Sequence, residues 1–144
     1  MMDKKALSRI SAFIEREALR SLAEKAAAGK EVIFLKKPEK TMVFMQVKEP
    51  VRQSLFYLGE LLAVHCIVEL AGVRGAAVLM GDDLGKAEST AILDAAHTGG
   101  FAEFAGIEQE LLRFEEIRKE QISKQASAVR ETQVRFHALL DQEV

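Results

Sequence analysis

Apolar residues recur at three- and four-residue steps along residues 3–28. This spacing is typical of one face of a helix, and the stripe consists of Leu7, Ile10, Ile14, Ala18 and Leu22. Asp3 stands where a helix cap is expected, and Gly29 follows as a stop signal. The pattern predicts one N-terminal helix from Asp3 to Ala28.

The middle of the chain changes to apolar runs that are typical of strands. They span residues 31–35, 41–47, 53–58, 61–71 and 76–80. Gly59 is expected to form a bend or bulge, and residues 72–75, Gly-Val-Arg-Gly, a hairpin loop. Consecutive strands without helices between them favour an antiparallel meander.

Two of these runs are apolar on both faces. Residues 42–45 read Met-Val-Phe-Met, and residues 76–80 read Ala-Ala-Val-Leu-Met. Because a strand with one wet face should alternate apolar and polar residues, both faces of this sheet need a cover. The chain's own helices can cover one face. The C-terminal helix and another subunit are equally open as covers of the other, and an uncovered face would favour a homodimer of the isolated chain.

A short helix is predicted after the strands, from Leu84 to Ala96. Asp83 is placed to cap its first turn, and the pair Gly99-Gly100 ends it.

A long helical segment follows, because apolar residues between Ala102 and Leu140 have a period near 3.6. We expect it to break near Ser123 or Ser127, and a long terminal helix is commonly a docking element. The predicted fold class is α+β, in a single domain of residues 1–144. An antiparallel β meander packs with the N-terminal helix, the Leu84–Ala96 helix and the long C-terminal helical segment.

Composition narrows the classes of partner. The net charge is −2, so no basic footprint for nucleic acid or a membrane surface is present. The single cysteine, Cys66, excludes an internal disulfide and is expected to be a reduced core residue. No signal-peptide pattern or bilayer-spanning apolar run is visible, so we expect a cytoplasmic protein.

The passage Gly-Asp-Asp-Leu-Gly-Lys at residues 81–86 is the strongest candidate for a binding site. Lys86 could reach a phosphate, and Asp82 and Asp83 together with Glu88 could hold Mg²⁺. The favoured interpretation is structural: Asp83 caps the helix and Asp82 complements its dipole. We therefore assign no metal site.

The remaining polar candidates lie apart from one another. Glu60 follows Gly59 and is a turn residue or, less favoured, a substrate ligand. His65, His97 and His137 lie in different elements without zinc-ligand spacing. Residue chemistry alone thus gives little support for catalysis by this chain, and its catalytic residues stay unknown.

The order of several short motifs resembles that of the PhnG family, the G subunits of the bacterial carbon–phosphorus lyase system. The resemblance covers about Thr41 to Phe136. It rests on Phe56-Tyr57-Leu58-Gly59-Glu60, Val68-Glu69-Leu70-Ala71-Gly72, Val78-Leu79-Met80-Gly81-Asp82-Asp83, Lys86-Ala87-Glu88, Ala91-Ile92-Leu93-Asp94-Ala95 and Thr132-Gln133-Val134-Arg135-Phe136. His137, Ala138 and Leu139 stand where the family continues with Phe and Thr-Met.

The resemblance implies a role in organic phosphonate catabolism. In that family, G joins H, I and J subunits in a core complex, and possibly L. The complex supports formation of alpha-D-ribose 1-phosphonate 5-triphosphate from ATP and a phosphonate. It is expected to use ATP with Mg²⁺, and an iron–sulfur cluster in another subunit, whereas no cofactor is expected in this chain.

The resemblance favours a scaffold over a catalytic subunit of this transferase complex. Two alternatives remain. One is a self-contained metal- or nucleotide-binding enzyme that uses Asp82, Asp83, Lys86 and Glu88, and the other is a homo-oligomeric interaction module.

Overall fold

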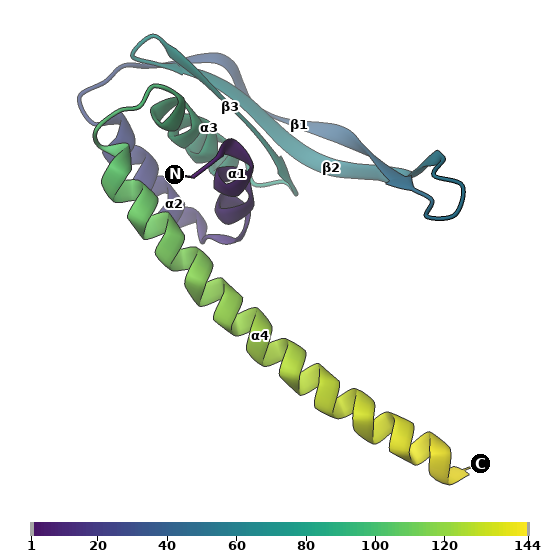
Figure 1. Cartoon of the computed structure of the whole chain (residues 1–144). Coiled ribbons are helices and arrows are strands. Elements are labelled where there is room, and N and C mark those ends of the chain that lie inside the picture. The colour runs from purple at the N-terminus through teal and green to yellow at the C-terminus, as the bar shows by residue number, and fades with distance from the viewer. Residues whose placement is uncertain (1, 144) are drawn as a thin grey trace. The chain divides into compact units, whose positions relative to one another are not determined.

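The computed structural model describes the backbone of residues 2–143 and the side chains of residues 2–128 (Figure 1). Within that part, two helices precede three strands and two helices follow them. The elements are α1 (Lys4–Phe13), α2 (Arg16–Ala27), β1 (Val32–Lys48), β2 (Leu55–Leu70), β3 (Val73–Met80), α3 (Leu84–Thr98) and α4 (Phe104–Glu143). The chain forms two compact units, Met1–Leu111 and Leu112–Val144, which we call the N-terminal and C-terminal units. The α+β class and the antiparallel meander are confirmed, with strand order β1-β2-β3.

The predicted single N-terminal helix is wrong, because the chain turns at Ile14 and forms two helices. Ile14 has an extended backbone, with φ −74° and ψ 142°, and its side chain is buried. The second helix then buries Leu19 instead of Ala18. The Asp3 cap is confirmed, since its carboxylate accepts a hydrogen bond from the N–H of Ala6.

The predicted separation of the first four strands is also wrong, because they merge into two long ones. β1 runs without interruption through Pro38. Proline is tolerated there because β1 is an edge strand, and the pairing with β2 shifts register between Lys36 and Glu39. β2 likewise continues through Gly59. Met45 pairs with Gly59 and Gln46 with Tyr57, so Leu58 is an extra residue, and the bulge expected at this position is confirmed.

The hairpin between β2 and β3 is shorter than the sequence predicts. Ala71 and Gly72 alone form the turn, with φ of 49° and 84°. Two consecutive positive φ values give a turn that matches the twist of the flanking strands. Val73 and Gly75, which were expected in the loop, are therefore the start of β3.

β1 and β2 extend beyond β3 as a two-stranded ribbon, which we call the arm (residues 42–62; Figure 1). The last residue of β3, Met80, pairs with Ala63, and the N–H of Gly81 donates to the carbonyl of Leu62 at 2.9 Å. The arm thus begins where the third strand ends.

α3 is the central helix of the N-terminal unit. It packs on β3 and β2 on one side and on α1 and α2 on the other. Residues 87 and 89–96 are all buried, which explains why its small residues replace the usual amphipathic pattern. The backbones of α3 and β3 lie close together at Gly75, where an added Cβ would lie 2.2 Å from the carbonyl oxygen of Ala91.

Asp94 is a buried acid that joins this helix to the sheet. Its carboxylate accepts a hydrogen bond from the backbone N–H of Ala76 at 2.9 Å. Asp94 belongs to a motif that carries the family resemblance, so this hydrogen bond gives the motif a structural role.

α4 begins with buried Phe104, Ile107 and Leu111 in the N-terminal unit. The predicted break near Ser123 or Ser127 is wrong, since both residues lie within the helix. In the C-terminal unit the side chains of Leu112, Ile117 and Ile122 are exposed. The predicted apolar positions from Val129 onwards, and His137, lie outside the residues with described side chains. Over the described residues, no helix combines the length and apolarity needed to cross a bilayer.

Candidate protein interface and the start of helix α3

The passage at residues 81–86 joins α3 to the turn between α1 and α2. One oxygen of Asp83 accepts from the backbone N–H of Lys86 at 3.1 Å, which confirms the predicted cap. The other accepts from Nε of Arg16 at 3.0 Å. Nζ of Lys86 donates to the carbonyl oxygen of Ala12, near the end of α1, at 2.9 Å. Both side chains thereby hold the helices together.

The carboxyl group of Asp83 has a lowered pKa. Partial burial acts to raise this pKa, but the hydrogen bonds from Lys86 and Arg16 and their positive charges outweigh it. These groups stabilise the ionised form. Asp83 is therefore a carboxylate across the physiological pH range.

Replacing Asp83 tests this role. We expect Asp83→Ala to lower the free energy of unfolding by about 1–2 kcal/mol, because the helix cap is lost together with a partly exposed ion pair. Asp83→Asn keeps a cap and removes only the charge. Since the folded-state pKa lies below the unfolded value, the contribution of the charge is complete above about pH 4 and is lost as the pH falls through the folded pKa. Urea unfolding of both variants and the parent chain at pH 7 and pH 3 measures the contribution of this charge to the free energy of unfolding. If the parent and Asp83→Asn differ in free energy of unfolding as much at pH 3 as at pH 7, the assignment is contradicted.

The other acidic candidates point to no shared cation site. Asp82 is exposed. Glu88 lines a hollow of about 320 Å³ together with Arg16 and Arg20. Among the described residues, no group of three or more His, Cys, Asp or Glu side chains is placed to hold a metal ion.

Glu60 lies on the arm and not with the acidic residues at the start of α3. Its backbone pairs with Phe44, and it borders a shallow hollow with Phe44, Tyr57 and Leu58. The rings of Phe44 and Tyr57 meet edge to face, with centroids 5.8 Å apart. The carboxylate of Glu60 is thus surrounded by exposed apolar side chains.

Among the described side chains, His65, His97 and Cys66 have separate surroundings. Cys66 is fully buried, and burial, with a smaller contribution from the charge of Glu88, raises the pKa of its thiol to about 11. His65 lies 3.6 Å from the carboxylate of Glu39 on the neighbouring strand. Nε2 of His97 lies 2.5 Å from the carbonyl oxygen of Met2, so this ring helps to hold the N-terminus.

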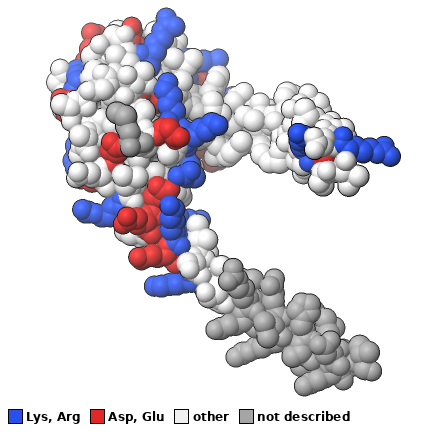
Figure 2. Space-filling view, in the orientation of Figure 1, with Lys and Arg blue, Asp and Glu red and all other residues white. Residues whose placement is uncertain are grey.

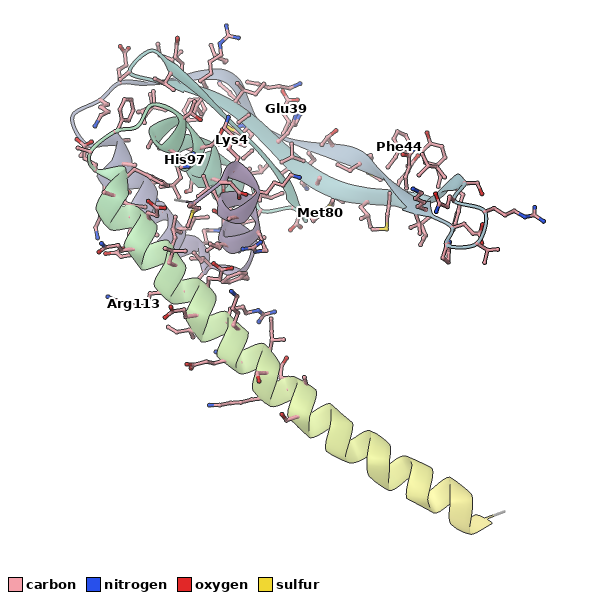
Figure 3. All side chains as sticks on the ribbon, in the orientation of Figure 1. Lys4, Glu39, Phe44, Met80, His97 and Arg113 are labelled. Carbon is pink, nitrogen blue, oxygen red and sulfur yellow. The ribbon has the colours of Figure 1, made fainter. Side chains whose placement is uncertain are left out.

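The sheet face opposite α3, which we call the outer face, is uncovered by other described elements of the N-terminal unit. It carries Val78 and Met80 of β3, which are 55% and 60% exposed, and Ile33 of β1 (Met80 is labelled in Figure 3). The polar side chains of His65, Glu69 and Arg74 share this face. The strict alternation of β3 places Ala77 and Leu79 on the buried face. Residues 76–80 are therefore apolar on both faces, as predicted for this run, whereas the outer face as a whole also carries charged side chains.

The arm exposes apolar side chains on both of its sides. Figure 2 shows it as mostly uncharged, with Lys and Arg gathered at its tip. Its exposed large apolar side chains are Met42, Phe44, Met45, Val51, Leu55, Phe56, Tyr57, Leu58 and Leu62. Sequence reasoning missed the arm as a unit, although the apolar residues at consecutive positions were its signal. A ribbon with two exposed apolar sides is suited to burial in a protein interface.

Comparison with known proteins identifies the family. No curated protein matches the chain. The family model described as phosphonate metabolism protein PhnG matches residues 2–140, a longer stretch than the one that carries the resemblance in short motifs. The match includes the arm, the outer face and the start of α3. This chain belongs to the PhnG family of phosphonate metabolism proteins.

Proposed function

We propose that this chain is a scaffold subunit of a carbon–phosphorus lyase core complex. There it supports formation of alpha-D-ribose 1-phosphonate 5-triphosphate from ATP and a phosphonate. Membership of the PhnG family places the chain in phosphonate metabolism. The finer role rests on the observation that the arm, together with Val78 and Met80 at the end of β3, exposes many large apolar side chains.

The surface is the observation that favours a scaffold. Single exposed apolar residues are ordinary on soluble proteins, but a contiguous patch that includes Val78, Met80 and the arm is typical of an interface. Of the candidates at the start of α3, Asp83 and Lys86 are engaged in structural bonds instead. We assign the outer face to a partner subunit of the H, I or J type.

Co-expression of the tagged chain with H-, I- and J-type subunits tests the assembly. We expect all of them to be retained through an affinity column and a subsequent sizing column. Recovery of the tagged chain without an I-type partner would count against the proposal.

The alternative, a metal- or nucleotide-binding enzyme using Asp82, Asp83, Lys86 and Glu88, predicts binding by the isolated chain. Binding of Mg²⁺ by Asp83 would have to displace Arg16, and binding of a phosphate by Lys86 would have to break its bond to Ala12. Titration calorimetry with Mg²⁺ and ATP is therefore expected to show no saturable heat. A saturable signal that Asp82→Asn abolishes would revive the alternative.

A further inference from the structure

The sheet has four stretches of free edge, and two of them are protected against pairing with another strand. The first half of the β1 edge carries Lys-Lys-Pro-Glu-Lys at residues 36–40, together with register shifts, whereas its second half on the arm, residues 41–47, has no charged residue and no proline and is also open. Charged residues, proline and irregular pairing all discourage strand addition. The edge of β3 is covered by α3, whose Asp94 accepts the N–H of Ala76 and whose backbone lies against Gly75.

The fourth stretch is the side of β2 that extends past the end of β3. We call residues Leu55 to Leu61 on that side the arm edge. It has no lysine and no proline, and Glu60 is its one charged residue. In the described part of the chain no strand lies beside it. The bulge at Leu58 is its one irregularity.

Backbone groups on the arm edge are directed outward. The N–H of Glu49 donates to the carbonyl of Ser54, so Ser54 faces β1, and Gly81 donates to Leu62, so Leu62 faces the side of β3. Along an antiparallel strand, the backbone N–H and C=O groups of successive residues point alternately to the two sides of the strand. The N–H and C=O groups of Leu55, Tyr57 and Glu60 therefore point to the open side, where an added strand would satisfy them.

Charge differs in sign between the two ends of the arm edge. The tip carries Lys48 and Arg52 against one acid, Glu49, and Figure 2 shows Lys and Arg at this end of the arm. The base is followed directly by Gly81 and the exposed Asp82. If a second arm edge runs antiparallel to the first, the tip of each copy abuts the base of the other. Opposite charges then meet twice, between Arg52 of one copy and Asp82 of the other.

We propose that two copies of this chain pair their arm edges antiparallel about a two-fold axis near Leu58. The pairing joins both sheets into one. A symmetric interface of this kind is self-complementary: the same segment supplies both sides, and the charges at its ends match. The pairing is independent of the phosphonate role and leaves the outer face free for other subunits.

Cross-linking locates the axis. In the full chain, Leu58→Cys places two thiols beside the axis, so mild oxidation is expected to give a disulfide-linked dimer. Val51→Cys, at the tip, is the matched control: the two copies of this residue lie at opposite ends of the paired segment and stay unlinked. The buried Cys66 does not interfere. Linkage through Val51→Cys but not through Leu58→Cys would overturn the proposal.

Charge reversal tests the register. Sedimentation equilibrium over a dilution series gives the dimer dissociation constant of the full chain. Arg52→Glu and Asp82→Arg are each expected to raise it about tenfold, because an attractive pair becomes repulsive at two places. The double variant restores the pairs and is expected to restore the constant. A parent chain that stays monomeric at every concentration, or single variants that dimerise as the parent does, would overturn the proposal. Co-purification with other subunits is a separate measurement and is unaffected by either result.

Discussion

Gly75→Ala is expected to destabilise the N-terminal unit by more than about 3 kcal/mol, which exceeds the usual cost of overpacking a core. A Cβ at this position would lie 2.2 Å from the carbonyl oxygen of Ala91 and 2.4 Å from the backbone nitrogen of Ala95. Both atoms belong to the backbone of α3, so no side-chain rotation relieves the clash. The helix would have to move away from the sheet, and the hydrogen bond between Asp94 and Ala76 would be lost with it.

Gly106→Ala is the matched control for the same change of one methyl group. Gly106 lies in α4, and an added Cβ there meets nothing within 4 Å. Alanine is the better helix former, so this variant is expected to gain about 0.5–1 kcal/mol. Urea unfolding of both variants and the parent measures the expected loss of stability in Gly75→Ala and the expected gain in Gly106→Ala. A Gly75→Ala variant as stable as the parent would show that α3 does not lie against β3 at this distance.

Charges on the outer face are expected to prevent assembly without unfolding the chain. Val78→Lys and Met80→Lys together place two ammonium groups on side chains that are more than half exposed in the isolated chain. Surface changes of this kind alter stability by less than about 0.5 kcal/mol. In an interface the same charges would be desolvated without partners, so affinity for the partner subunit should fall at least about tenfold, equivalent to 1.4 kcal/mol or more.

Ala105→Lys controls for the added charge, because Ala105 is exposed on α4, outside the sheet. It should bind as the parent does. The affinity would be measured by binding to a surface-captured I-type subunit or with the co-expressed partners. Circular dichroism would show whether each variant keeps the fold. Equal binding by the double variant and the parent would remove the outer face from the interface.

Features that depend on neighbouring residues could be predicted from the sequence. Asp3 and Asp83 cap helices through bonds that reach three residues along the chain. The succession of strands also predicts the meander, because hairpins connect consecutive strands. The bend at Ile14 escaped prediction, since its side chain fits the same apolar stripe whether or not the helix continues. Local periodicity does not report a change of helix direction.

The arm escaped prediction for a different reason. Pro38 and Gly59 normally interrupt strands, but an edge position accommodates the first and a bulge the second. At the start of α3, the sequence identified Asp83 and Lys86 but not their partners. Arg16 and Ala12 lie 67 and 74 residues away in the chain, and the packing of α1 and α2 on α3 brings them together.

Release of adenine from ATP tests the scaffold role most directly. H-, I- and J-type subunits, with an L-type subunit where required, would be mixed with ATP, Mg²⁺ and a phosphonate, with and without this chain. We expect adenine release only when the chain is present. Full activity is expected with Asp82→Asn, and loss of activity with Val78→Lys/Met80→Lys. Equal release without this chain, or release by this chain alone, would contradict the scaffold role.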